Sequence, residues 1–182
     1  MFNGLVSSKV VDKAKLELFE DLMLPHLNSA HNLARWLTRN DQDAQDVVQE
    51  AYLRAFRFFD GFKGGDGRAW LLEIVRNTRR TFHRRQNETV PFDEATNTRD
   101  SHSPDPDQRL VDGQKAKVVR GCIEALPPEF REVLVMRELE EMSYKEIADV
   151  TKVAIGTVMS RLSRARKRLE DCAKKRTMET AR

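Results

Sequence analysis

The chain has 182 residues, of which 40% are hydrophobic and 34% are charged, and its formal net charge is +3. These values exclude a largely disordered chain and allow one medium domain or two small ones. So small a positive excess matters only if the basic side chains gather on one surface.

Membrane-spanning, secreted and metal-binding classes find no support in the sequence. No apolar run approaches the roughly 18 residues that span a bilayer, and residues 1–15 lack the apolar core and cleavage site of a signal peptide. Cys122 and Cys172 stand far apart, outside any CxxC motif. The histidines show no ligand spacing: His26, His31, His83 and His102. We therefore expect no metal, no cofactor and no disulfide framework, no membrane insertion, and a reducing, cytoplasmic compartment.

The spacing of apolar residues predicts an all-α fold. Apolar side chains recur at intervals of three and four through most long segments, and strand-like alternation is hard to find. We predict two small helical domains, at residues 13–86 and 113–175. A flexible acidic linker at residues 87–112 joins them.

The clearest helix of the first domain is "AQDVVQEAYLRAFRFF", residues 44–59. Its predicted buried face is apolar and comprises Ala44, Val47, Val48, Ala51, Ala55 and either Phe58 or Phe59. Asp41 or Asp43 is expected to cap its N-terminus. The opposite face is polar, which fits a surface helix.

A glycine-rich break and a basic helix follow. "DGFKGGDGRAW" contains four glycines, and "AWLLEIVRNTRRTFHRRQ" begins apolar and ends basic. Five arginines fall in the ten residues that start at Arg76. Cations near a helix C-terminus are stabilised by the helix dipole, but five arginines are more than that interaction requires.

The segment at residues 87–112 has three prolines, no periodicity, and seven acidic residues against two arginines. It is predicted to be irregular and to repel nucleic acid. Such a linker allows the two domains to adopt different separations.

The second domain ends in a predicted helix-turn-helix. Pro127 and Pro128 begin one helix, and Ser143 with Glu146 forms a capping box that starts the next at Tyr144. A short turn then precedes a helix from Ile155 to about Ala173. The residues expected in the core are Leu134, Val135, Ile147, Val150, Val158 and Leu162.

The last helix is basic along one face. Gly156 and Thr157 leave room for a phosphate at its N-terminus. The side chains predicted to contact DNA are Thr157, Ser160, Arg161, Ser163, Arg164 and Lys167. Arginine can donate two hydrogen bonds to guanine, whereas lysine and serine suit phosphates.

Two stretches together resemble one known family. "DAQDVVQEAYLRAFRFFDGF" resembles region 2 of the sigma-70 family of bacterial transcription initiation factors, and "LPPEFREVLVMRELEEMSYKEIADVTKVAIGTVMSRLSRARKRL" resembles region 4. A chain with only these two regions is typical of the extracytoplasmic-function (ECF) subgroup. The resemblance covers roughly residues 16–175.

The resemblance implies a non-enzymatic factor with three contact surfaces. Region 2 would dock on the β′ coiled coil of core RNA polymerase through Asp46, Gln49, Glu50, Leu53 and Arg54. It would read the promoter −10 element as a single strand through Phe62, Lys63, Asp66, Asn77, Arg80 and Arg84. Region 4 would bind the β flap and read the −35 element. An anti-sigma protein is an expected further partner.

Three positions need separate comment. Trp70 lies in the −10 segment but is better explained by core packing. Met159 stands where the family often has Arg or Lys, so one polar contact to the −35 element is missing. Lys152 occupies a turn position where glycine is common, and a left-handed backbone there would cost about 1 kcal/mol.

Three other classes of protein fit the sequence less well. A free-standing dimeric helix-turn-helix regulator would share the last helix, but it has no need of a second basic surface. An anti-sigma or adaptor protein has no need of Arg161 and Arg164 on a groove-reading helix. An enzyme is the weakest interpretation, because no nucleophile–base pair, phosphate loop or metal-ligand cluster is present.

Overall fold

The computed structural model describes residues 3–88 and 112–180 of the chain, and within these ranges it consists of helices with no β-strand. In chain order the elements are α1 (Asn3–Met23), η1 (Leu24–His26), α2 (Leu27–Thr38), α3 (Asp41–Phe58), η2 (Phe59–Gly61), α4 (Gly67–Glu88), α5 (Asp112–Glu124), α6 (Pro128–Glu138), α7 (Tyr144–Thr151) and α8 (Ile155–Thr180). The predicted all-α class with two helical lobes is confirmed. Most of the predicted linker lies outside the described residues.

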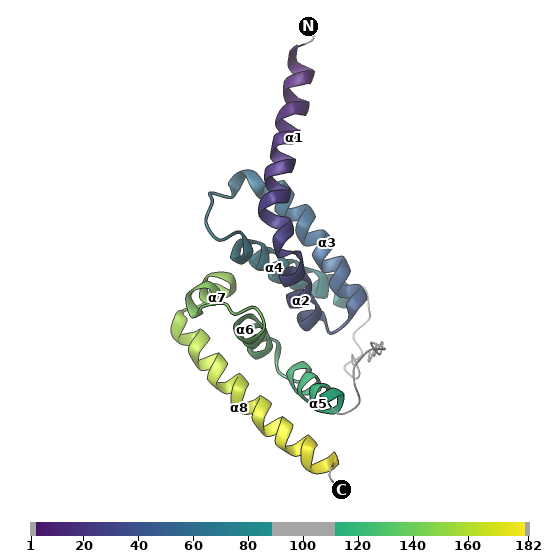
Figure 1. Ribbon diagram of the computed structural model, residues 1–182, viewed down its shortest axis with the longest axis vertical. Coiled ribbons are helices and arrows are strands. Elements are labelled where there is room, and N and C mark those ends of the chain that lie inside the picture. The colour runs from purple at the N-terminus through teal and green to yellow at the C-terminus, as the bar shows by residue number, and fades with distance from the viewer. Residues whose placement is uncertain (1–2, 89–111, 181–182) are drawn as a thin grey trace.

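The first lobe is a bundle of α2, α3 and α4 that the end of α1 completes (Figure 1). The apolar face predicted for α3 is buried, and of the two phenylalanines it is Phe59 that packs inward while Phe58 stays exposed. The predicted N-cap is wrong. Asn40 caps α3, because its side chain accepts a hydrogen bond from the Asp43 amide at 3.1 Å. Asp41 and Asp43 lie in the first turn, where their charges suit the helix dipole.

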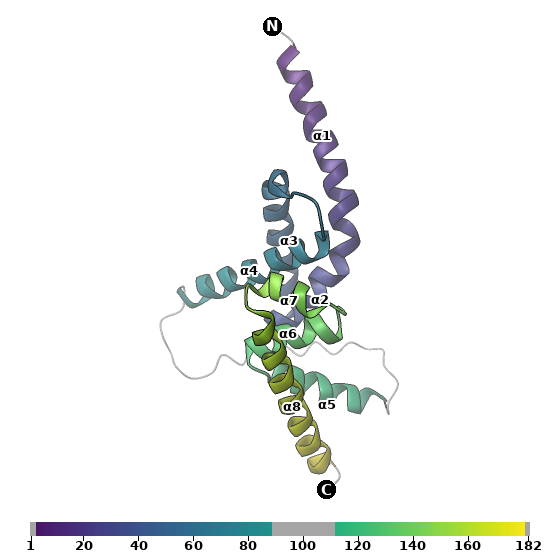
Figure 2. The same cartoon turned by 90° about the vertical axis from the view of Figure 1, so that its left-hand side faces the viewer.

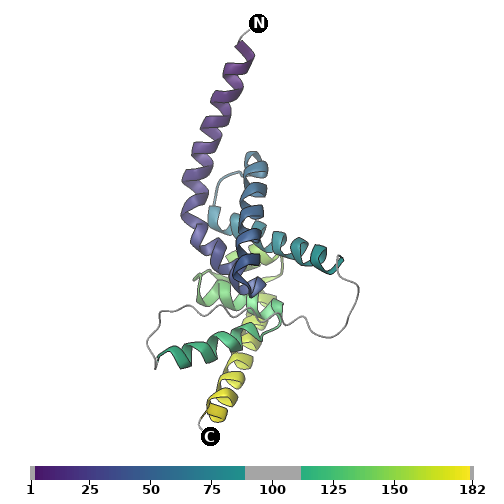
Figure 3. The same ribbon diagram turned by 90° about the vertical axis from the view of Figure 1, so that its right-hand side faces the viewer.

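Most of α1 projects away from the body of the molecule (Figures 2 and 3). Its C-terminal end is anchored by Phe19 and Met23, which are buried. The Phe19 ring meets the rings of Phe56 and Phe59 edge-on, with centroids 5.2 Å apart in both pairs. The two described chain ends therefore lie at opposite ends of the molecule, because α8 extends the other way (Figure 1).

The second lobe contains the predicted helix-turn-helix, α7–turn–α8. The capping box is present: the Ser143 side chain accepts from the Glu146 amide at 3.2 Å, and the Ser143 amide donates to the Glu146 carboxylate at 2.6 Å. The hydrogen bonds with Ser143 also lower the pKa of Glu146. Lys152 does adopt the left-handed conformation, with φ at 55°. The last helix, α8, continues to Thr180, beyond the predicted end at Ala173.

A disulfide joins α5 to α8, which contradicts the expectation from the sequence. Cys122 and Cys172 are bonded, with their Cα atoms 5.8 Å apart. The two residues are separated by 50 positions, so their spacing gave no signal. They meet because α5 packs along the C-terminal half of α8 (Figure 1).

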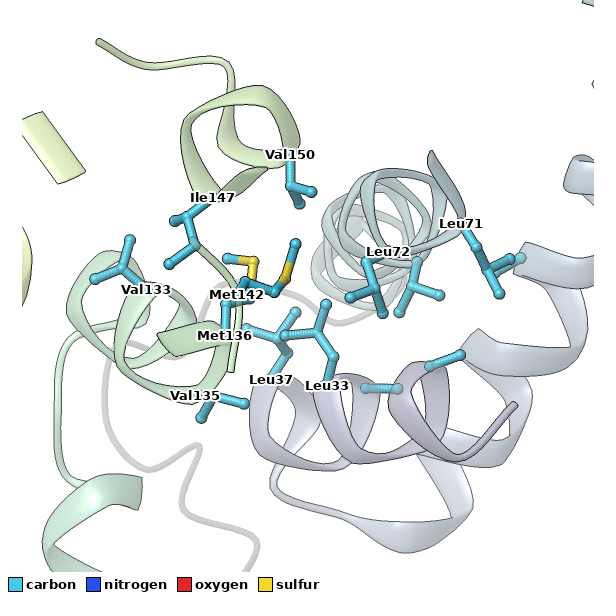
Figure 4. Packing of buried hydrophobic residues seen from close by; sticks show 14 of the residues in the cluster. Leu33, Leu37, Leu71, Leu72, Val133, Val135, Met136, Met142, Ile147 and Val150 are labelled. Carbon is cyan, nitrogen blue, oxygen red and sulfur yellow. The ribbon is translucent and has the colours of Figure 1, made fainter. Parts of the chain in front are cut away.

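The two lobes share one hydrophobic core. α2 packs on α6, and α4 packs on α7. Figure 4 shows Leu33 and Leu37 of α2 and Leu72 of α4 facing Met136 of α6 and Met142, which precedes α7. All five side chains are buried. The described lobes are therefore packed into a closed unit, although nothing in the sequence pattern required them to touch.

Reduction of the disulfide should destabilise the second lobe. A bond that closes a loop of this length stabilises the fold by about 4 kcal/mol through the unfolded state. We expect dithiothreitol to lower the melting temperature of the protein, measured by circular dichroism.

The matched control is the double variant Cys122→Ala/Cys172→Ala. It should melt lower than the wild type, and dithiothreitol should leave its melting temperature unchanged. If the wild type melted at the same temperature with and without reductant, the claim that the Cys122–Cys172 disulfide stabilises the protein would be wrong.

Candidate nucleic-acid and polymerase interfaces

The N-terminal half of α8 presents the side chains predicted for the −35 element. Its inner face is apolar, with Val158, Leu162 and Ala165 buried against the lobe. Its outer face exposes Ser160, Ser163, Arg164 and Lys167. Thr157 is half-buried, and its carbonyl accepts a hydrogen bond from the Ser160 hydroxyl at 3.0 Å. The structure thus brings these polar groups onto one accessible helix face.

Arg161 differs from the other predicted contacts because it is turned toward the body of the molecule. Its side chain is 25% exposed, and its Nη1 lies 3.6 Å from Oε1 of Glu132 on α6. The guanidinium is therefore already engaged by a carboxylate of its own lobe.

Glu132 also binds Arg76 of α4, and this ion pair crosses between the lobes. Arg76 Nε lies 2.7 Å from Oε2 and Arg76 Nη2 lies 3.1 Å from Oε1, while both side chains are at most 10% exposed. A two-pronged pair of this kind is among the strongest hydrogen-bonded contacts in proteins. Arg76 is thus withdrawn from the basic track that the sequence suggested.

Further polar contacts join the lobes around this pair. Lys152 Nζ lies 2.8 Å from Glu73, and Asn32 donates to Glu140 at 3.3 Å. Arg131 donates to the Trp36 carbonyl at 3.1 Å, and its burial lowers its pKa to about 10. The interface therefore combines an apolar centre with a charged border.

The glycine-rich loop before α4 positions the residues predicted for the −10 element. Phe62 packs between the rings of Phe59 and Trp70, with centroid distances of 6.0 and 5.0 Å. Trp70 is partly buried against the core, as expected. Lys63 and Asp66 are exposed, and Asp66 accepts a hydrogen bond from the Ala69 amide at 3.1 Å, which caps α4. Asp66 and Phe62 thus have evident structural roles.

The basic end of α4 carries the remaining −10 candidates. Asn77 and Arg80 are exposed, so a nucleic-acid strand can reach both. Burial lowers the pKa of the half-buried Arg79. The side chain of Arg84 lies outside the part of the chain that the structure describes.

The polar face of α3 presents the residues predicted to dock on polymerase. Asp46 and Gln49 are exposed, and Leu53 is 50% exposed although it is apolar. Arg54 Nε lies 2.7 Å from Glu50 Oε1, one turn away on the same helix. The second lobe packs on α2 and α4, so this face of α3 remains open in the closed arrangement.

One residue of the interface between the lobes that the sequence did not reveal is Glu132. It is buried at 7% exposure in a helix whose residues 130–136 are all buried. The one available signal was a carboxylate within the apolar run "FREVLVM", where a charge needs a partner. Among the described residues there is no group of histidines, cysteines and carboxylates that could hold a metal. Nor is any helix in these ranges long and apolar enough to cross a membrane.

A helix-turn-helix lobe packed on a second lobe with its own basic helix is an arrangement suited to binding nucleic acid. Family comparison identifies the class of protein: residues 22–89 match the model of sigma-70 region 2, and residues 116–169 match that of sigma-70 region 4. The chain is 32% identical to the ECF RNA polymerase sigma factor SigE of Mycolicibacterium smegmatis, over 93% of this chain and 67% of that protein. The chain belongs to the ECF subgroup of the sigma-70 family.

Other relatives and solved structures support this assignment to the sigma-70 family. The ECF RNA polymerase sigma-E factor of Haemophilus influenzae is 31% identical, over 76% of this chain and 78% of its own length. The sigma factor RpoE in its complex with the anti-sigma factor NepR from Bartonella quintana matches with a TM-score of 0.66 and 26% identity, covering 86% of this chain and 96% of that one. CnrH in complex with the cytosolic domain of CnrY matches with a TM-score of 0.62 at 23% identity, over 91% and 94% of the two chains, which shows the shared fold.

Replacing Glu132 should loosen the lobes. Glu132→Gln leaves the Arg76 guanidinium buried without its counter-ion, a loss of about 3–5 kcal/mol for such pairs. We expect a larger radius of gyration by small-angle X-ray scattering, with the helix content by circular dichroism retained.

Glu138→Gln is the matched control on the same helix. Its partner is Arg166 at 2.7 Å, and both side chains are about half exposed, so the pair is worth little. This variant should scatter like the wild type. If both variants scattered alike, Glu132 would not hold the lobes together.

Proposed function

We propose that this chain binds core RNA polymerase and directs promoter-specific initiation by recognising a −35 and a −10 element. The observation that carries the proposal is the presence of two separate exposed polar surfaces, on α4 and α8, within one member of the ECF family. A factor with these surfaces acts by binding and is not an enzyme. It would work in the cytoplasm, where core polymerase and promoter DNA are found.

The roles of the two DNA-reading surfaces differ. On α8, Arg164 would contact a base edge of the −35 element, while Lys167 would contact a phosphate. Arg161 would join them once it leaves Glu132. On the first lobe, Asn77 and Arg80 would hold the melted −10 strand, which needs a polar and basic track.

The exposed face of α3 would dock on polymerase. Leu53 is an apolar side chain surrounded by polar neighbours, as expected for the centre of a small protein interface. Because this face is open in the closed arrangement, polymerase can reach it before the lobes separate.

We further propose that binding to polymerase and promoter separates the lobes. Lys152, directly before the reading helix, pairs with Glu73 of the first lobe, and α7 packs on α4, so the first lobe lies against the helix-turn-helix while the lobes are closed. The segment between the lobes is long enough to let them lie at a different distance from each other in the open form.

An anti-sigma protein is the proposed regulator. The solved structure of RpoE, which matches 86% of this chain, contains the anti-sigma factor NepR. A protein that covers both lobes would keep this chain from polymerase. Co-purification of the chain with the products of neighbouring genes would identify that partner.

Run-off transcription tests the proposed function directly. Core polymerase is incubated with and without the chain on a pool of promoter fragments from the source genome. We expect discrete transcripts that require the chain and whose templates share two sequence elements. No transcripts and no co-migration with core polymerase would contradict the proposal and favour a free-standing regulator.

Substitutions on α8 should separate base reading from phosphate binding. Arg164→Ala should weaken recognition of the −35 element by about 1–3 kcal/mol, because a two-pronged base contact is lost. Lys167→Ala should weaken binding to all sequences alike and lower the salt slope by about one. Both are measured as holoenzyme affinity on matched and scrambled −35 elements. Equal losses on both elements from Arg164→Ala would contradict its assignment as a base reader.

A further inference from the structure

Two large apolar side chains are exposed at the start of the reading helix. Ile155 is 47% exposed and Met159 is 53% exposed. They are one turn apart on α8, so they are neighbours on the helix surface. Ser163, one turn beyond Met159, is exposed beside it.

Neither the fold nor the closure of the lobes accounts for this pair. The inner face of α8 is already supplied by Val158, Leu162 and Ala165, which are fully buried. The lobe interface is made by α6, by α7 and by Lys152, which pairs with Glu73. Ile155 and Met159 therefore stand free of both the core and the lobe interface.

The chemistry of the major groove offers a partner for such a pair. Base edges there present hydrogen-bond donors and acceptors, and one protruding apolar group, the C5 methyl of thymine. The flexible, polarisable side chain of methionine adapts well to a small apolar partner. Lysine or arginine at position 159 would instead contact a phosphate or a guanine.

The surrounding charge places this edge against DNA. Lys167 is exposed two turns beyond Met159 on the adjoining side of α8, whereas Arg164 lies further round the helix. A helix whose cations contact the duplex brings its first turns into the groove, where base edges are accessible. The apolar pair is thus directed at bases and not at phosphates.

We propose that Ile155 and Met159 form an apolar reading edge that selects a thymine methyl group in the −35 element. The inference rests on the proposed function, because it requires that α8 reads this element. It adds a specificity that polar contacts alone would not provide. Met159 makes the central contact, and Ile155 excludes water from it.

Deoxyuridine provides the test, since it pairs as thymidine does but lacks the C5 methyl. A randomised −35 element is first selected with the holoenzyme to define the preferred sequence. Each thymine of that sequence is then replaced by deoxyuridine, one at a time, and holoenzyme affinity is measured. We expect one position at which the wild-type holoenzyme loses about fourfold in affinity, the value of one buried methyl group.

Variants assign that loss to the reading edge. Met159→Ala should bind the thymine and uracil forms equally, whereas Met159→Leu should retain a preference for thymine. Arg164→Ala should bind more weakly overall and still distinguish thymine from uracil. This last variant separates a lost methyl contact from a general loss of DNA binding.

The outcomes distinguish the two levels of the proposal. Absence of any selected −35 sequence would defeat the proposed function itself. A selected sequence with no thymine sensitive to uracil replacement would overturn the apolar reading edge alone. So would a thymine preference that persists unchanged in Met159→Ala.

Discussion

The closed structure depends on one buried carboxylate. Glu132 sits on a helix buried on nearly all sides, and a carboxylate in such surroundings costs several kcal/mol unless it is paired. The partner is Arg76, which comes from the other lobe and donates two hydrogen bonds. Closure of the lobes thus supplies the closer of the two cations that face Glu132, while the other, Arg161 at 3.6 Å, belongs to its own lobe. Since Arg161 also faces this carboxylate, the same group connects lobe packing to the helix that would read DNA.

This coupling suggests an order of events at a promoter. Closure leaves the α3 face around Leu53 accessible, whereas Lys152, directly before the reading helix, is paired with Glu73 of the first lobe. Polymerase can shift the protein from the closed to the open form only if it binds the open form more tightly than the closed form. This difference in binding free energy must exceed the free energy of the contacts between the lobes that are lost. Once the lobes separate, Glu132 and Arg76 are exposed to water and lose little, because solvent replaces the pair. The contacts between the lobes can therefore be lost together, in one step, when the lobes separate.

Local features of the fold could be predicted from the sequence, and long-range ones could not. The capping box of Ser143 depends on neighbouring residues, so its pattern was sufficient. The left-handed turn at Lys152 was raised only as a condition, from the resemblance to a family that often has glycine there. The cap at Asn40 was missed because Asn40, Asp41 and Asp43 could each serve. The disulfide joins residues 50 apart and the Arg76–Glu132 pair residues 56 apart, and no periodicity encodes such contacts. The candidate DNA-contacting residues of α8 were found from their types and helical spacing, but the engagement of Arg161 was not.

The separation of the lobes is the most direct test of this account. Fluorescent labels are attached at Glu20 of α1 and Asp171 of α8, both exposed and outside the proposed contact surfaces, through azide-bearing residues that spare the cysteines. Energy transfer between them is measured in the free chain and after addition of core polymerase and promoter. We predict one high-transfer population in the free chain and a low-transfer population in the active complex. Unchanged transfer in complexes that initiate transcription would contradict the claim that the closed form must open.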